Sequence, residues 1–310
     1  MTNKGALGKL KIIIKLFMVK IFLTGGNGFI GRNIKEQLGH TYEIIAPTHE
    51  ELDLTDSQAV YTFLQNNPVD IVIHAANIGG TRKQRHVFGI THVNLKMFFN
   101  LVRAKPFYTR MINLGSGAEY DKQQSLVRVK ETDFDTFVPT DEYGLYKYVC
   151  AQYAAKVDYI THLRLFAVFG KYEDYEIRFI SNAICRALLK SPITMRQNVF
   201  FDYLFIDDFI RILERCIEHK PSETFINIGC GEAVDLKTLA DKILQELGYE
   251  VPVLISSKGL SKEYSCDVSH LKKLFPDITF TPIDFAIAQL VAYYKIALPA
   301  LNSQTLLKDY

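Results

Sequence analysis

The sequence lacks the marks of several large protein classes. Its 310 residues carry a formal net charge of only +2, too little for the basic surface of a typical nucleic-acid or membrane-surface protein. The basic and apolar stretch 11–17 is too short, and too interrupted by lysine, to span a bilayer. No small-residue cleavage site follows it, so we expect no signal peptide. We therefore expect neither a nucleic-acid partner nor a membrane.

Cysteine is scarce and scattered. The sequence contains five cysteines and no C-x-x-C pair: Cys150, Cys185, Cys216, Cys230 and Cys266. Structural zinc sites commonly use such close pairs, so the pattern argues against zinc and we expect no metal site. Isolated cysteines are typical of free, mostly buried thiols in a reducing compartment, which favours the cytoplasm.

What the sequence does contain is a glycine-rich turn directly after a short apolar run. Residues 19–23 have the character of a strand, and residues 24–31 follow with the spacing G-x-x-G-x-x-G. Gly25 allows a tight turn, Gly28 lets the backbone approach a pyrophosphate, and Gly31 lets the following helix pack closely on the strand. The helix N-terminus adds free N–H groups for the anion. Such turns also occur without a ligand, so the turn alone leaves both interpretations open.

A tyrosine and a lysine stand four residues apart further along the chain. If their segment is helical, Tyr143 and Lys147 project from one face. A phenol has a pKa of about 10 in water and a neighbouring ammonium favours its ionised form, so such a pair works as general acid or base beside a carbonyl. The alternative is an exposed Tyr/Lys pair on an ordinary amphipathic helix.

A serine completes this set. Ser116 follows directly after the strand-like segment 111–114 and Gly115, and its hydroxyl is a candidate to hydrogen-bond the substrate oxygen that Tyr143 protonates. A serine after a strand is usually part of a turn, so its position alone proves nothing. The signal for a common site is the order of the three elements along the chain, with the glycine turn first, the serine second and the Tyr/Lys pair third.

In this order, these elements resemble the extended short-chain dehydrogenase/reductase family of the NAD-dependent epimerase/dehydratase type. The resemblance runs from about residue 18 to about residue 295, and its first half is most similar to the GDP-fucose synthase branch, notably over residues 48–56. Other matching segments are 74–76, Asn94, Ser116 with Tyr120, 164–170, 201–208 and 227–231.

The resemblance implies an α/β fold, a doubly wound parallel Rossmann sheet with a smaller mixed α/β substrate lobe. Alternating apolar and amphipathic segments favour the same arrangement. We expect strands over 20–24, 43–46, 71–74, 111–114 and 162–165, and helices over 30–38, 57–66, 91–104, 141–157 and 178–189.

The resemblance also divides the chain. Residues 18–169, with a return segment near 200–229, are expected to form the NAD(P)-binding domain, and 170–199 with 230–310 the substrate-binding lobe. Residues 1–17 precede the strand that normally opens proteins of this family. We expect them to be an ill-ordered extension, with Met18 as the natural start.

Individual residues receive roles from the resemblance. Ser116 polarises a ketone, Tyr143 donates a proton and Lys147 binds the nicotinamide ribose, which makes these three the catalytic residues. Cofactor binding is assigned to Gly25, Asn27, Gly28, Phe29, Ile30, Gly31, Thr48, His49, Asp53, Leu54, Ala75, Ala76, Asn94, Lys147, Phe166 and Val168. His74 is expected to be a structural residue at a strand end.

The end of the second strand bears on cofactor choice. NAD enzymes usually place a carboxylate there to bind the ribose hydroxyls, and it would repel a 2′-phosphate. This sequence reads Ala-Pro-Thr-His over 46–49, with no carboxylate before Glu50. Thr48 and His49, with Arg32 as a further candidate, are in a position to receive the phosphate. NADP(H) is therefore favoured, and NAD(H) stays possible.

Missing residues narrow the reaction. The family's dehydratases carry acidic residues directly after the active-site hydroxyl, where this sequence has Gly117 and Ala118; Glu119 follows and is expected to face away. GDP-fucose synthases epimerise with a cysteine and a histidine, and Ala118 and Tyr172 occupy those positions. What remains is reduction of a 4-keto sugar nucleotide with NADPH, or 4-epimerisation with NAD. A non-catalytic NADP-binding sensor or scaffold is disfavoured because the Tyr/Lys pair is kept.

Two departures from the family pattern concern the nucleotide-sugar substrate. Ala167 stands where the family usually has Asn, and Phe201 where an Arg commonly clamps the diphosphate. Arg178 and Arg196, besides Ser116, are candidates for substrate binding, although either arginine can equally be an ordinary surface residue.

Apolar helices give one more expectation. Members of the family form homodimers through a four-helix bundle, and the helices that would supply it here carry Phe98, Phe99, Tyr146, Val149, Cys150 and Tyr153. The alternative is that these side chains belong to the core of one subunit.

Overall fold

The computed structural model describes residues 18–80, 83, 87–301 and 303–306. The extension expected over residues 1–17 lies outside these ranges. Within them, no helix combines the length and the apolar character needed to cross a membrane. The five cysteines carry free thiols, and all except Cys230 are buried.

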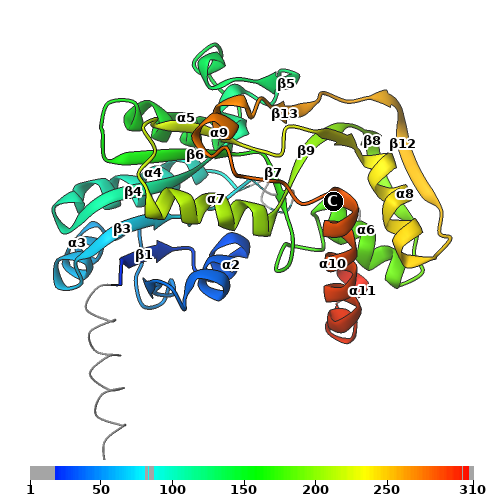
Figure 1. The fold of residues 1–310 in the computed structure, drawn as a ribbon, viewed down its shortest axis with the longest axis horizontal. Helices are drawn as coiled ribbons and strands as arrows, with labels where there is room; N and C mark the ends of the chain where they lie inside the picture. The colour runs from blue at the N-terminus through cyan, green and yellow to red at the C-terminus, as the bar shows by residue number, and fades with distance from the viewer. Residues whose placement is uncertain (1–17, 81–82, 84–86, 302, 307–310) are drawn as a thin grey trace, which may run out of the picture.

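A parallel sheet forms one half of the molecule (Figure 1). Among the described residues it has six strands in the order β2-β1-β3-β4-β6-β10, every neighbouring pair parallel. Its strands are β1 (Lys20–Thr24), β2 (Glu43–Ile45), β3 (Val69–His74), β4 (Tyr108–Ser116), β6 (Ile160–Leu165) and β10 (Phe225–Ile228). Their nearly continuous apolar character follows from burial on both faces.

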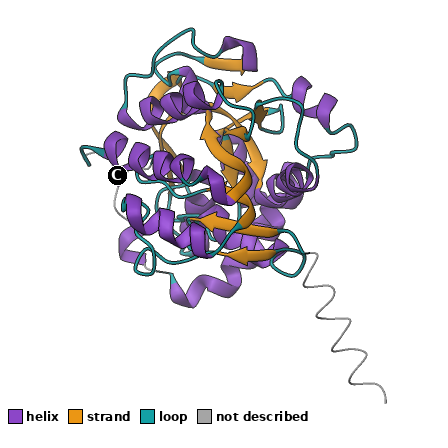
Figure 2. Ribbon diagram, turned by 90° about the vertical axis from the view of Figure 1, so that its left-hand side faces the viewer, coloured by secondary structure: helices purple, strands orange, loops and turns teal. Residues whose placement is uncertain are grey.

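Helices cover both faces of this sheet, so the doubly wound prediction is confirmed. On one face α3 (Ser57–Asn66), α4 (Ile90–Arg103) and α5 (Glu142–Ala154) pack side by side, and on the other α2 (Phe29–Leu38) packs on α7 (Ile206–Glu218). Figure 2 shows the strands between these helical layers. The chain reverses its direction of travel across the sheet between β1 and β3, which is where doubly wound folds bind nucleotides.

A mixed lobe forms the other half. β9 (Phe200–Phe205) and β13 (Tyr264–Cys266) lie at the centre of a sheet ordered β11-β9-β13-β5, and β7 (Ala167–Phe169) pairs with β9. The edge strands are β11 (Ala233–Asp235) and β5 (Leu126–Val129). Three strands of this group, β5, β7 and β9, come from segments that were expected to belong to the NAD(P)-binding domain. A separate parallel pair joins β8 (Ile193–Asn198) to β12 (Val253–Leu260).

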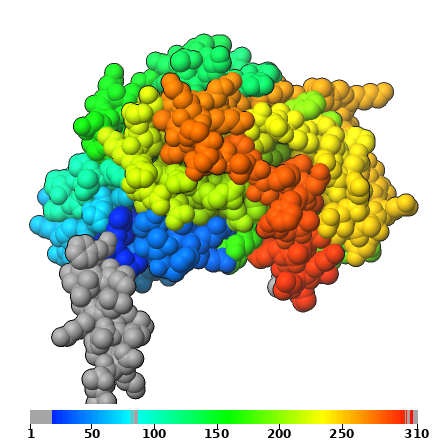
Figure 3. Space-filling view, viewed as in Figure 1, coloured from blue at the N-terminus to red at the C-terminus, as the bar shows by residue number. Residues whose placement is uncertain are grey.

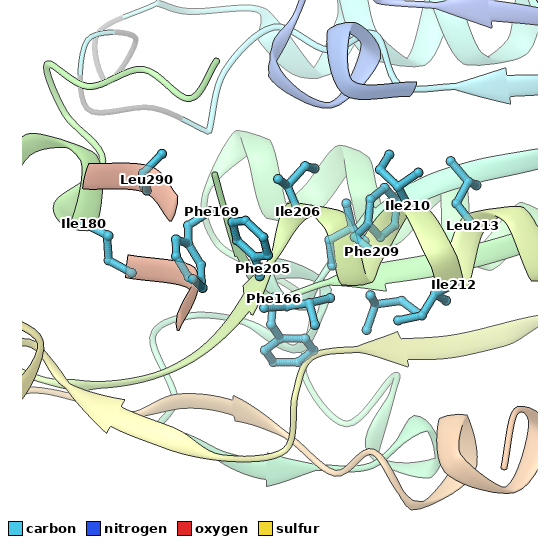
Figure 4. Close-up of a cluster of buried hydrophobic side chains, with 14 of the residues drawn as sticks. Phe166, Phe169, Ile180, Phe205, Ile206, Phe209, Ile210, Ile212, Leu213 and Leu290 are labelled. Atoms are coloured by element: carbon cyan, nitrogen blue, oxygen red, sulfur yellow. The ribbon is translucent and has the colours of Figure 1, made fainter. Parts of the chain in front are cut away.

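The lobe's helices pack together beside these strands. α6 (Phe179–Leu188), α8 (Leu236–Leu247) and α10 (Ile283–Ala297) contact one another, and α11 (Ser303–Leu306) packs on α6. The short helix α9 (Ser269–Leu274) instead packs on β10 of the parallel sheet. On the face drawn in Figure 3 the two halves form one continuous body. Figure 4 shows why: apolar side chains of α7 meet Phe166, Phe169 and Phe205 in one buried cluster.

Candidate active site

The glycine turn is built so that two of its glycines admit no side chain. Gly25 has a φ of +70°, and a Cβ there would lie 2.7 Å from the backbone nitrogen of Ala76. A Cβ on Gly31 would lie 2.1 Å from the carbonyl oxygen of Gly25. Gly25 therefore permits the tight turn and the contact with the loop after β3, and Gly31 permits α2 to begin against the turn.

The start of α2 fits a pyrophosphate. Gly28 is the N-cap residue and no side chain caps the helix, so the first N–H groups of α2 have no side-chain partner. Asn27 is exposed on the turn, and Phe29 and Ile30 are half-buried in the first turn of the helix. A glycine cradle with a helix N-terminus at the carboxyl ends of β1 and β3 matches what a dinucleotide requires.

Thr24 links the two strands that flank this cradle. Its Oγ1 accepts the N–H groups of Ala75 and Ala76 at 3.1 Å each and lies 2.8 Å from Nδ1 of His74. The hydroxyl proton is therefore directed to Nδ1, and His74 carries its proton on Nε2. Burial lowers the pKa of His74 to about 3, so the ring is neutral. His74 thus shapes the loop at the end of β3, in agreement with a structural role.

Asn94 fixes the same loop from α4. Its amide donates to the carbonyl oxygens of Ile78 and Ile90, both at 2.8 Å, and its oxygen accepts the N–H of Ile78 at 2.9 Å. The side chain is buried and committed to these backbone groups. Asn94 thereby holds the loop after β3 against α4.

Ser116, Tyr143 and Lys147 come together at the end of β4. Ser116 is the last residue of that strand, and Tyr143 lies in the first turn of α5, whose N-cap Asp141 accepts the N–H of Gly144 at 3.0 Å. One turn later Lys147 is buried, donates to the carbonyl oxygen of Leu114, and has its Nζ 5.9 Å from the centre of the Tyr143 ring.

The glycines after β3 connect these residues to the cradle. A Cβ on Gly80 would lie 2.7 Å from Cε2 of Tyr143, so the backbone of this loop packs directly on the tyrosine ring. The loop that follows Ala75 and Ala76 therefore borders Tyr143 as well. The glycine turn, the loop after β3 and Tyr143 therefore lie side by side at the carboxyl edge of the sheet.

A family model described as the NAD dependent epimerase/dehydratase family matches residues 21–229. That span covers more than half of the 310 residues and holds the glycine turn, Ser116, Tyr143 and Lys147. The chain belongs to this family. Membership makes the protein an NAD(P)-dependent enzyme.

Individual relatives agree with this placement. A GDP-L-colitose synthase of Yersinia pseudotuberculosis is 36% identical over 112 residues, 34% of this chain and 35% of that protein. A GDP-L-fucose synthase of Azorhizobium caulinodans is 26% identical over 286 residues, 82% of this chain and 90% of that protein.

Solved structures with the same fold include two enzymes of different reaction type. The UDP-glucose 4-epimerase of Thermotoga maritima has a TM-score of 0.78 at 19% identity, over 90% of this chain and 100% of its own. The GDP-mannoheptose C4 reductase of Campylobacter jejuni, with NADP bound, has a TM-score of 0.77 at 18% identity, over 90% and 98%. At these identities the likeness establishes the fold.

This member of the epimerase/dehydratase family has a buried charge network that the sequence did not reveal. Glu119, expected to face away, turns into the interior beneath Ser116. Its Oε1 accepts the backbone N–H of Ser116 and hydrogen-bonds Nε2 of His162, both at 2.8 Å, and its Oε2 accepts Nε–H of Arg164 at 2.7 Å. A Cβ on Gly115 would lie 2.5 Å from Glu119 Oε1, so glycine is needed before the serine.

The network holds one ion pair. Burial by itself raises the pKa of Glu119, but His162 and Arg164 outweigh it and hold the pKa at about 2. Burial lowers the pKa of His162, and its Nδ1 lies 2.9 Å from the side-chain nitrogen of Asn113. His162 is therefore neutral, with Nδ1 accepting from Asn113 and Nε2–H donating to Glu119. Ser116 rests on a carboxylate paired with Arg164.

Aromatic side chains surround the substrate side of Ser116. The rings of Phe166 and Tyr264 lie 4.9 Å apart and those of Phe201 and Tyr264 5.9 Å apart. A Cβ on Gly117 would lie 2.6 Å from the hydroxyl oxygen of Tyr264. Tyr264 thus fills the space beside Gly117, and Phe201 and Phe166 form an aromatic row with it.

Four further candidates for substrate or cofactor binding lie in the chain after β6. Arg178 is exposed as the N-cap residue of α6, and Arg196 is exposed on β8. Phe166 is buried and Val168 is half-buried on β7.

The end of β2 differs from the sequence expectation in one respect. The N–H of Thr48 donates to Glu51 Oε2 at 2.7 Å, and the exposed Asp53 binds the backbone and side chain of Thr55. Leu54 is half-buried nearby and His49 is exposed. The guanidinium of Arg32, a candidate for phosphate binding, instead lies 3.8 Å from the centre of the Tyr172 ring. Arg32 is thus turned toward the segment that follows β7.

Proposed function

We propose that this protein reduces a 4-keto sugar nucleotide with NADPH. One observation carries the proposal: Tyr143 lies against the loop that borders the glycine cradle, with Lys147 one turn away on the same helix. Tyr264 occupies the space beside Gly117, a position at which the resemblance places an acid in the dehydratases. The names of relatives support the substrate class, since they include a GDP-mannoheptose C4 reductase with NADP bound and GDP-L-fucose synthases.

In the proposed reaction Ser116 makes a hydrogen bond to the substrate and Tyr143 transfers a proton. When bound, NADPH supplies the hydride that adds to C4 of the sugar. The Ser116 hydroxyl hydrogen-bonds the ketone oxygen, and the Tyr143 hydroxyl gives that oxygen its proton, so that the product is an alcohol. Lys147, fixed to the carbonyl of Leu114, holds a positive charge beside Tyr143. Fixed positions and this proton transfer supply most of the acceleration.

The lobe has a binding role in this proposal. Residues 170–199 and 230–310 cover the substrate over the carboxyl edge of the sheet, with Arg178 and Arg196 facing the nucleotide. The aromatic row around Tyr264 provides flat apolar surface for a sugar or a base in place of the missing arginine.

We further propose a cytoplasmic homodimer formed by α4 and α5. Phe98, Tyr146 and Cys150 are buried within the subunit, so they belong to its core. Phe99 is 38% exposed, and its ring lies 5.4 Å from that of Tyr153 on the neighbouring helix. Val149 is half-buried on α5. These three side chains form the apolar surface available for a four-helix bundle.

The alternative is an NAD-dependent 4-epimerase, favoured by the likeness to the UDP-glucose 4-epimerase of Thermotoga maritima. An epimerase regenerates a tightly held NAD in every cycle. The test is to denature freshly purified protein and identify the released nucleotide by mass spectrometry. Stoichiometric NAD supports the epimerase; protein without bound NAD that takes up added NADPH supports the reductase.

A further inference from the structure

We propose that Lys35, on α2, supplies the positive charge that binds the 2′-phosphate of NADPH. The inference rests on the proposed use of NADPH and assigns its cofactor specificity to one side chain. It replaces Arg32, the basic residue of the same helix that the sequence put forward.

The stem of Lys35 lies where the glycine turn approaches the end of β2. A Cβ on Gly26 would lie 2.8 Å from Cβ of Ala46 and 3.6 and 3.7 Å from Cδ and Cε of Lys35. The glycine turn, the residue after β2 and the lysine stem therefore meet at one point. In a dinucleotide fold the 2′ position of the adenosine ribose lies at the end of the second strand, beside this turn.

The hydrogen-bond partner of Lys35 is a neutral amide. Its Nζ donates to Oδ1 of Asn27 at 3.0 Å, and within the described ranges no carboxylate lies within 4.0 Å of it. An ammonium whose partner is a neutral amide can turn to a phosphate without breaking an ion pair. The half-buried stem rests against the turn, so the charged end is held near the ribose.

The other basic candidate is already engaged. Arg32 lies over Tyr172, whose hydroxyl donates to Glu36 Oε2 at 2.8 Å, and Lys171 pairs with the other oxygen of Glu36 at 2.6 Å. Arg32 is thus part of a cluster that contains a carboxylate and joins α2 to the segment after β7. Redirecting its guanidinium would break the contact with Tyr172.

The neighbouring strand end explains why a cation is needed there. Thr48 offers its hydroxyl, but its N–H is used by Glu51, and that carboxylate lies close to where the phosphate would bind. A 2′-phosphate needs charge-assisted hydrogen bonds to offset this repulsion. From the side of α2, Lys35 can provide such a hydrogen bond beside Thr48 and His49.

The test compares nucleotides that differ only in the 2′-phosphate. Adenosine 2′,5′-bisphosphate and 5′-AMP, then NADPH and NADH, are titrated by calorimetry into the wild-type protein, Lys35→Met, Lys35→Arg and Arg32→Met. Methionine keeps most of the apolar stem of Lys35 and removes the charge together with its hydrogen-bond donors. Arg32→Met is the matched control, since it removes an equal charge one turn earlier on the same helix.

We expect Lys35→Met to weaken binding of adenosine 2′,5′-bisphosphate and of NADPH about 10- to 100-fold, the loss of one charged hydrogen bond, and to leave 5′-AMP and NADH unchanged. Lys35→Arg should retain most of the preference, and Arg32→Met should leave the NADPH to NADH ratio unchanged.

Two results would overturn the inference by itself: a wild-type preference for NADPH that persists in Lys35→Met, or an equal loss in Arg32→Met, which would indicate general electrostatics. A wild-type protein with no preference for the 2′-phosphate would overturn both this inference and the proposed cofactor.

Discussion

The carboxylate of Glu119 lies 2.8 Å from the backbone nitrogen of Ser116, so a fully buried charge accepts the amide N–H of the proposed substrate-binding serine. The same carboxylate holds Arg164 on the neighbouring strand β6. The guanidinium in turn lies 4.2 Å from the centre of the Phe134 ring and 4.4 Å from that of Phe225. The end of β4, where the chemistry is proposed, is therefore fixed by an ion pair.

Removing the negative charge should be costly. In Glu119→Gln the buried Arg164 loses its counter-charge, and we expect the free energy of unfolding to fall by about 3–5 kcal/mol. Glu119→Val with Arg164→Leu removes both charges and should recover much of the loss. Urea unfolding followed by circular dichroism measures both variants. A single variant as stable as the wild type would show that the pair is not needed.

The pH dependence of this pair has a defined sign. The pKa of Glu119 is about 2 in the folded protein, below the ordinary value of 4.5, so its contribution is complete above about pH 4.5 and is lost as the pH falls toward 2. The wild type should lose more stability than the double variant over that interval. If the stabilities of the wild type and the double variant fell in parallel over that interval, the lowered pKa of Glu119 would be contradicted.

A second buried carboxylate should act in the opposite direction. Burial raises the pKa of Glu173 to about 7, against the opposing effects of Arg178 and the hydrogen bond from Ser181. Because the folded value exceeds the ordinary 4.5, stability is favoured below about pH 4.5 and declines as the pH rises through 7. We expect Glu173→Gln to match the wild type at pH 5 and to exceed it by about 1–3 kcal/mol at pH 8. Thermal unfolding of both proteins at the two pH values checks this. If Glu173→Gln were more stable than the wild type by the same amount at both, the raised pKa of Glu173 would be refuted.

Two glycines of the turn should respond differently to substitution, because Gly31 is needed for packing and Gly28 for the approach of a ligand. Gly31→Ala forces a methyl group against the carbonyl of Gly25, and we expect it to lower stability by about 1–3 kcal/mol and to abolish tight NADPH binding. Gly28→Ala meets only that same oxygen at 3.3 Å, so it should cost at most about 1 kcal/mol, yet weaken NADPH binding because its methyl faces the pyrophosphate. Calorimetry with NADPH, beside a melting curve, distinguishes the two; unchanged affinity in Gly28→Ala would place the pyrophosphate elsewhere.

Light scattering tests the dimer. Phe99→Glu places a charge in the surface formed by α4 and α5 and should convert the dimer to a monomer. Phe285→Glu, on the exposed face of α10, is the matched control and should leave the dimer intact. A monomeric wild type, or a dimer that survives Phe99→Glu, would reject this interface.

Local patterns in the sequence were sufficient for the fold but not for the whole site. Strands buried on both faces read as apolar runs, and the helix predicted over 57–66 matches α3 at both ends. The network under Ser116 was not predictable because the partners of Glu119 lie 43 and 45 residues away, and no local pattern pairs them. Tyr264 reaches Ser116 from the lobe, and it fills a space left by Gly117 that is visible only after folding.

The choice between Arg32 and Lys35 shows the same limit. Both belong to α2, and their spacing from the glycine turn gives neither an advantage. Tyr172, from a distant segment, engages Arg32, while the stem of Lys35 lies beside Gly26 of the glycine turn, close to the end of β2. Side-chain direction at the cofactor edge is set by these neighbours.

The most direct test of the account is NADPH oxidation, followed by absorbance at 340 nm, with a 4-keto sugar nucleotide as substrate. We expect stoichiometric oxidation by the wild type, a turnover at least about 100-fold lower in Tyr143→Phe, and little change in Tyr148→Phe on the same helix. NADPH affinity should be equal in all three proteins. A wild type that interconverts 4-hydroxyl epimers without consuming NADPH, or Tyr143→Phe turning over at the wild-type rate, would contradict the account.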